Sequence, residues 1–176
     1  MPSEISINRA PVMTLWAAVV AQRLGFTWEE ALSLGKAVAG LNAQAKGRRL
    51  GIFKPHEEKT KAAREKERGE EFSIELCGRP VPAKNTDEGI RAVSGRAVVD
   101  SESALHYLES KFGDNLDAVR SAMTELAKAY KPKELAVEAF SLYEQFRPEI
   151  PEGTRGWGAK GDLDLRKIKA MARRKG

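Results

Sequence analysis

The sequence predicts a mainly helical α+β fold, with a helical bundle-like core and a short β-hairpin or two to three short strands. Two observations predict it. Helix-length apolar patterns with capping residues dominate residues 1–53 and 101–147, whereas apolar and polar residues alternate only just after residue 71. The 176 residues are 41% hydrophobic and 31% charged, which suits one compact domain with a buried core.

Residues 1–53 predict an N-terminal helical hairpin. Asn8 offers a helix cap, and the chain is apolar on nearly every side from there to Leu24, so this helix is expected at the centre of the core. A second helix is expected to start at the T-x-x-E capping box of Thr27 and Glu30.

The second helix is predicted to run to about Lys46 and to stop at Gly47. Ala31, Gly35 and Ala39 recur every four residues, which places small side chains on one face. We expect this face to pack closely on the first helix.

Residues 54–71 predict a charged connector, a solvated helix or flexible linker without a wide apolar face. Residues 72–100 predict a short β-hairpin region, with a hairpin around residues 72–86. Pro80 and Pro82 are expected to keep its second arm at a sheet edge, and Ile90–Val99 is expected to add another short strand.

Residues 101–147 predict three helices that pack as an antiparallel group. Ser101 and Asp114 are expected to cap the first two helices, and Pro132 suits the first turn of the third. Pro148 is expected to end it.

Residues 148–176 predict a Gly-rich loop followed by a basic C-terminal helix from about Leu163 to Arg174. Asp162 and Asp164 stand where this helix would begin, so they are expected to cap it. The helix has an apolar side, which favours docking on the body with its basic side left outside.

The excess of positive charge is confined to two segments. Lys46–Arg68 carries a net charge of +5 and Arg155–Gly176 carries +6, while the rest of the chain carries −6, for a total of +5. Such segregation suits contact with a polyanion, because neutralised phosphates release counterions, and it also suits solubility alone.

The candidate polyanion-binding residues come from a helix end, the Gly-rich loop and the terminal helix. Each group has a structural alternative: cations favour a helix C-terminus, Trp157 can pin the loop to the body, and the terminal helix can simply dock. The candidates are Lys46, Arg48, Arg49, Arg155, Trp157, Lys160, Arg166, Lys167, Lys169, Arg173 and Arg174.

The residues offer little for catalysis. One cysteine and two histidines cannot supply a Cys/His zinc site, so neither a metal nor another cofactor is expected. His106 lies near Glu102 and Glu109 at helical spacing, which is typical of a surface network, and Cys77 is expected as a small buried residue. The pattern leaves enzymatic activity open but favours a non-enzymatic protein.

A single cysteine suits a reducing compartment, and cytoplasmic residence is expected. The longest apolar run, Val12–Ala21, is shorter than a membrane-spanning helix needs, so no membrane insertion is expected.

The stretches INRAPVMTLWAAVVAQRLGF, AKGRRLGIF, YLESKFGD and GTRGWGAKGDLDL carry a resemblance that spans nearly the whole chain. With them the chain resembles a family of small uncharacterised bacterial proteins with no assigned activity. The resemblance implies bacterial origin and a single architecture, and it transfers no catalytic or binding residues.

The function expected from the residues is that of an interaction protein with weak, largely sequence-independent nucleic-acid binding, or binding to an acidic protein surface. A helix-turn-helix reading is weak, because the second helix opens with Trp28, Glu29 and Glu30, whose carboxylates oppose phosphates. One alternative is a homo-oligomeric module that shares the faces of the first two helices. A further alternative is an anion or small-molecule site, or an enzyme, that uses the 153–161 loop with Trp157, Lys160 and His106.

Overall fold

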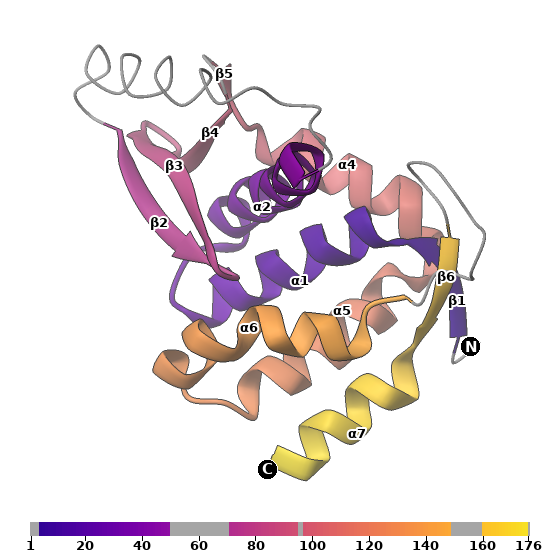
Figure 1. Cartoon of the computed structure of the whole chain (residues 1–176). Coiled ribbons are helices and arrows are strands. Elements are labelled where there is room, and N and C mark those ends of the chain that lie inside the picture. Colours follow the sequence, from indigo (N-terminus) through magenta and orange to yellow (C-terminus); the bar gives the residue numbers. More distant parts are fainter. Residues whose placement is uncertain (1–3, 50–70, 95–96, 149–159, 176) are drawn as a thin grey trace.

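The computed structural model describes residues 4–49, 71–94, 97–148 and 160–175, with the side chains of 42–49 excepted. It confirms the mainly helical α+β class (Figure 1). The helices are α1 (Arg9–Arg23), α2 (Trp28–Arg49), α4 (Ser101–Phe112), α5 (Leu116–Lys128), α6 (Pro132–Phe146) and α7 (Leu165–Lys175). The strands are β1 (Glu4–Asn8), β2 (Phe72–Leu76), β3 (Arg79–Thr86), β4 (Gly89–Ser94), β5 (Ala97–Val98) and β6 (Lys160–Asp164).

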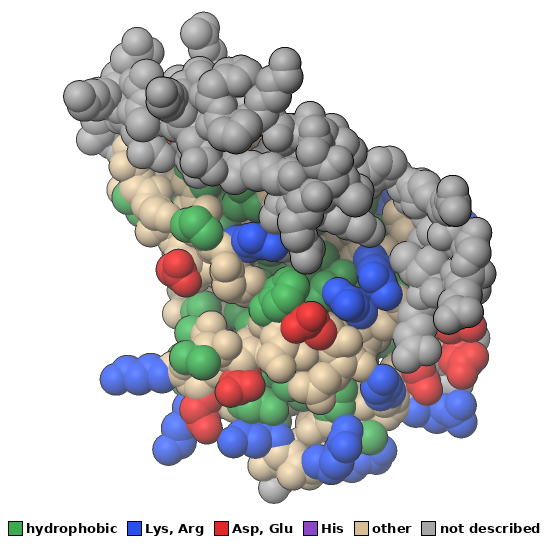
Figure 2. All heavy atoms as spheres, in the orientation of Figure 1, with side chains coloured by type: hydrophobic (Ala, Val, Ile, Leu, Met, Phe, Trp, Pro, Cys, Tyr) green, Lys and Arg blue, Asp and Glu red, His purple; other side chains and the backbone are tan. Residues whose placement is uncertain are grey.

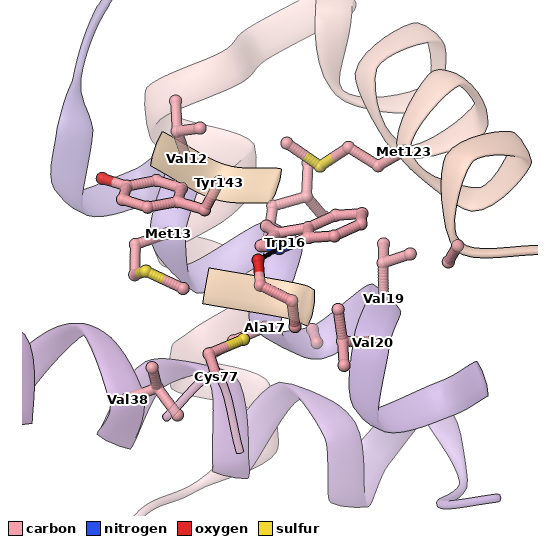
Figure 3. Close-up of a cluster of buried hydrophobic side chains, with 14 of the residues drawn as sticks. Val12, Met13, Trp16, Ala17, Val19, Val20, Val38, Cys77, Met123 and Tyr143 are labelled. Carbon is pink, nitrogen blue, oxygen red and sulfur yellow. Dashed lines mark hydrogen bonds between the residues drawn. The ribbon is translucent and has the colours of Figure 1, made fainter. Parts of the chain in front are cut away.

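Helix α1 is the centre of the core, as its composition predicts. Every residue from Pro11 to Ala21 is buried, and α2, α4, α5 and α6 all contact this helix. The Trp16 indole N–H donates a hydrogen bond to the Ala139 carbonyl at 2.9 Å, and its ring meets Phe146 edge-on with centroids 5.2 Å apart. In Figure 3 the ring lies among side chains that include Met123 of α5.

Helix α2 packs tightly along α1, as the small residues predict. A Cβ added at Gly35 would lie 2.5 Å from the Thr14 carbonyl oxygen and 2.9 Å from the Ala18 nitrogen. The end predicted for α2 is wrong: the helix continues through Gly47 to Arg49. Glycine inside a helix costs only about 1 kcal/mol, so it does not by itself end one.

The larger sheet has the order β2-β3-β4-β5, and all its pairs are antiparallel. The predicted hairpin is confirmed, with Cys77 and Gly78 both at positive φ in its two-residue turn, as a type I′ turn requires. The edge position predicted for the second arm is wrong, since β3 lies between β2 and β4. The two prolines fit because the pairing of β3 with β4 begins only at Ala83, beyond Pro82.

Two polar side chains of α2 attach this sheet to the helices. The Ser33 hydroxyl donates to the Val99 carbonyl at 2.7 Å and accepts from the Ala92 N–H at 2.8 Å. Glu30 accepts from the Thr27 N–H with one carboxylate oxygen and from the Ile90 N–H with the other, at 2.9 and 2.8 Å. The Thr27 hydroxyl accepts from the Glu30 N–H, so the predicted capping box is present.

The caps of the next helices differ partly from expectation. Asp100, not Ser101, caps α4, because its carboxylate accepts from the Ser103 N–H at 3.1 Å. Asp114 does not cap α5, since a short 3-10 turn over Gly113–Asn115 precedes that helix.

Helix α6 does begin at Pro132, as predicted. Each of the helices α4, α5 and α6 contacts α1 more than the three contact one another, so the expected antiparallel group of three is wrong and they form a shell around a central helix.

A second sheet, which the sequence did not predict, joins β1 to β6 in antiparallel register from Glu4↔Asp164 to Asn8↔Lys160. The helix start predicted at Leu163 is therefore wrong, and α7 begins at Leu165. Asp164 does cap it, by accepting from the Arg166 N–H at 2.9 Å. Asp162 instead lies within the strand, opposite Ser6.

A candidate basic surface on α7

Helix α7 is held to the body by its apolar side. Leu165, Ile168 and Met171 are buried, and the helix packs along α5. Because this side is fixed, the direction in which each of the other α7 side chains leaves the helix is fixed with it. The strand β6 leads directly into the helix and is itself paired with β1, which anchors the start of α7 (Figure 1).

The opposite side of α7 is cationic. At 3.6 residues per turn, the exposed cations of α7 other than Lys175 cover an arc of about 160° around the helix axis. They are Arg166, Lys167, Lys169, Arg173 and Arg174, all of them predicted candidates. Figure 2 shows Lys and Arg side chains gathered along this part of the molecule.

Most of this charge has no partner. Arg166 lies 3.8 Å from the Asp164 carboxylate, and Lys175 lies 3.2 Å from Glu134. Within the described part of the chain, the other four exposed cations of α7 make no ion pair or hydrogen bond. These four are Lys167, Lys169, Arg173 and Arg174.

The end of α7 adjoins the α5–α6 turn, which adds more charge. Lys175 binds Glu134 at the start of α6, and its ammonium also lies 5.0 Å from the ring centroid of Tyr130. Three exposed lysines flank this turn, namely Lys128, Lys131 and Lys133. Together with the four unpaired cations of α7 they define what we call the basic surface.

Sequence reasoning missed these three lysines because they belong to the acidic body of the chain. The cluster KAYKPK, from Lys128 to Lys133, was the available signal. The contacts of Lys175 with Tyr130 and Glu134 show that this cluster adjoins the terminal helix.

The remaining candidates are placed apart from α7 or lie outside the described residues. Lys160 is exposed at the start of β6, whereas Arg155 and Trp157 fall outside the described ranges. Lys46, Arg48 and Arg49 lie on the last turns of α2, where the structure describes the backbone only. Helices α2 and α7 lie on opposite sides of α1 and α6 in Figure 1, so the two helices that carry the basic segments do not share one face.

Helix α2 is also not free to read DNA through its first turns. Residues 31–35 are all buried against the rest of the protein. Trp28 is covered by the Arg120 guanidinium, whose central carbon lies 3.7 Å from a Trp28 ring centroid. The helix-turn-helix reading therefore has no exposed face at the position it needs.

The described residues contain no cluster of three or more His, Cys, Asp or Glu side chains able to hold a metal ion. Burial raises the pKa of the Cys77 thiol to about 12, so it stays protonated and unreactive in the folded protein. His106 is exposed on the outer side of α4.

An open cavity of about 710 Å³ lies between the end of α1 and α5. Two of its three cations make contacts: Arg23 donates to the Tyr130 carbonyl at 3.0 Å, and Arg120 stacks on Trp28. The third, Lys128, is exposed, and the Arg23 Nε is buried without a hydrogen-bond partner among the described residues. Asp117 and Glu125 also line it, so its charge is mixed. The cavity contains neither histidine nor cysteine.

No family model matches this chain, and comparison with curated proteins and with solved structures finds no similar protein. The family resemblance stated above accordingly stays a prediction. No described helix is both long and apolar enough to cross a membrane.

Proposed function

We propose that the protein binds nucleic acids through the basic surface, by contacts to phosphates with little reading of bases. The observation that supports this most directly is the set of four unpaired, exposed cations on one side of a docked helix. A docked helix presents its charges without the cost of ordering its backbone at the moment of binding, which favours contact with a regular polyanion.

The residue types favour phosphate contact over base recognition, because α7 has no Asn or Gln side chain to read adenine. Lys and Arg bind phosphate oxygens, and α7 has no aromatic side chain on which an unpaired base could stack. Affinity should therefore be strongly salt-dependent, with the logarithm of the association constant falling by about 0.9 per phosphate contacted for each decade of salt.

The test is a salt titration of binding to a short mixed-sequence DNA duplex, followed by fluorescence anisotropy. Lys167→Gln/Lys169→Gln should weaken binding and reduce the magnitude of the salt slope by about two. Asn85→Asp/Ser94→Asp is the matched control, because it changes net charge equally on exposed positions of β3 and β4.

Equal losses in the two variants would mean that net charge alone matters, and would contradict a role for this surface. Wild-type protein that fails to bind the duplex at low salt would remove the proposal altogether. If polyglutamate competes as well as duplex at equal charge, an acidic protein surface is the better partner.

The oligomeric alternative loses the surfaces on which it was based. The apolar side of α1 and the small-residue side of α2 are buried against each other inside one chain. Among the described residues, the large exposed hydrophobic side chains are Phe72, Val98 and Val137, which come from three different elements.

A further inference from the structure

A second group of cations lies between α2 and α4, away from the basic surface. The Lys36 ammonium lies 3.7 Å from the ring centroid of Tyr107, and the Lys111 ammonium lies 6.0 Å from the same centroid. Lys36 and Tyr107 are half-buried, whereas Lys111 is exposed. The packing of α2 against α4 thus brings two positive charges to one aromatic ring.

This group contains donors without acceptors. Within the described part of the chain, neither ammonium forms an ion pair or hydrogen bond, and the Tyr107 hydroxyl has no hydrogen-bond partner. The two glutamates of α4 point away from this group: Glu102 and Glu109 lie roughly 140–160° around the helix axis from Tyr107.

On α2, the nearest carboxylate on the same side as Lys36 is Glu29, about two turns earlier. No carboxylate of α2 or α4 therefore neutralises the two lysines.

Such an arrangement is costly without a counter-charge. Burial and the neighbouring charge of Lys111 both lower the pKa of Lys36, which shows that the folded protein opposes its charged form. The Tyr107 ring offsets part of this cost through its negative face. A bound anion would relieve the rest by accepting hydrogen bonds from both ammonium groups.

We propose that Lys36, Lys111 and the Tyr107 hydroxyl form a binding site for a small dianion of the phosphate type. A tetrahedral dianion carries enough oxygen acceptors for three donors, and lysine binds phosphate as a point charge. A single carboxylate has less charge and fewer acceptors, so it should bind more weakly.

The experiment is an NMR titration of the full chain with inorganic phosphate, compared with sodium chloride at the same ionic strength. Phosphate should shift the resonances of Lys36 and Tyr107 saturably, and sodium acetate should do so only weakly. By linkage, saturating phosphate should also raise the pKa of Lys36.

Lys111→Met is the decisive variant, because Lys111 is exposed and its removal should not affect folding. It should weaken phosphate binding about tenfold, the loss expected for one charge-assisted hydrogen bond. Lys84→Met, on β3, is the control and should leave phosphate affinity unchanged.

Equal shifts in chloride, shifts that never saturate, or an equal loss in Lys84→Met would each overturn the proposal. The phosphate of a nucleic-acid backbone is distinguished by titrating duplex DNA into Lys167→Gln/Lys169→Gln. Stronger shifts at Tyr107 with duplex than with inorganic phosphate would mean that this site is part of a nucleic-acid path, and the small-dianion proposal would fail.

Discussion

The Glu30 carboxylate connects α2 to the turn before it and to strand β4. It closes the capping box of α2, and it binds the Ile90 N–H at the start of β4. Burial raises the pKa of Glu30, but hydrogen bonds from Ile90 and Thr27, with the charge of Arg91, outweigh it and lower the pKa below the usual value of 4.5. The ionised form is therefore the form that stabilises the fold.

Glu30→Gln should lower the free energy of unfolding at neutral pH by about 1 kcal/mol, because an amide has one acceptor oxygen where the carboxylate has two. A group with a lowered folded pKa stabilises fully above its unfolded pKa and loses that effect as pH falls through the folded value. The difference between wild type and Glu30→Gln should accordingly shrink below about pH 4.

Urea denaturation at neutral and acidic pH measures this difference. The exposed neighbour Glu29 supplies the control, since Glu29→Gln should have little effect at either pH. A gap between wild type and Glu30→Gln that stays constant with pH would show that the charge of Glu30 is not involved.

Between whole elements, the close contact of α1 with α2 depends on Gly35, which has no side chain. Gly35 lies where the two backbones approach too closely for a Cβ, and Gly40, five residues later and exposed, has no atom within 4 Å of an added Cβ. Substituting the two glycines by alanine therefore distinguishes the effect of helix propensity, which both share, from the effect of helix packing, which only Gly35 has.

Gly35→Ala should destabilise the protein by about 1–3 kcal/mol, because overpacking against the Thr14 and Ala18 backbone outweighs the better helix propensity of alanine. Gly40→Ala should instead stabilise it, by up to about 1 kcal/mol. Thermal or urea unfolding of both variants checks this, and two changes of the same sign would contradict it.

Over the whole molecule, α1 organises the packing, and the β1–β6 sheet joins the first described strand to the strand that precedes α7. The exposed Lys and Arg side chains are also grouped across elements that are distant in the sequence. The basic surface combines α7 with the α5–α6 turn, while the basic end of α2 lies across the molecule from it (Figures 1 and 2). The buried hydrophobic side chains of the described residues form one main core cluster, so global unfolding should expose them together.

Cys77 offers a probe of that unfolding, because its thiol is buried at the turn between β2 and β3 and packs in the main core. We expect a thiol reagent such as Ellman's reagent to label native protein slowly and urea-unfolded protein quickly. Gly35→Ala should increase the native labelling rate. Fast labelling of native wild type would show that this turn opens independently of the core.

The sequence by itself determined the features that depend on neighbouring residues. The apolar run of α1, the capping box of Thr27 and Glu30, the proline start of α6 and the β2–β3 hairpin are local patterns, and the structure has all four. The five candidate cations of α7 were named from the same kind of local reasoning, and the structure leaves them exposed.

Only the tertiary structure decided which distant residues meet. Strands β1 and β6 have five residues each, of which two are buried. This pattern is too short to predict a pairing across more than 150 residues of chain. The meeting of Lys175 with Tyr130 and Glu134, and of Lys36 with Tyr107, likewise depends on how helices pack around α1. Local periodicity determines which face of an element is buried, but its neighbour on that face is chosen by the packing of the whole chain.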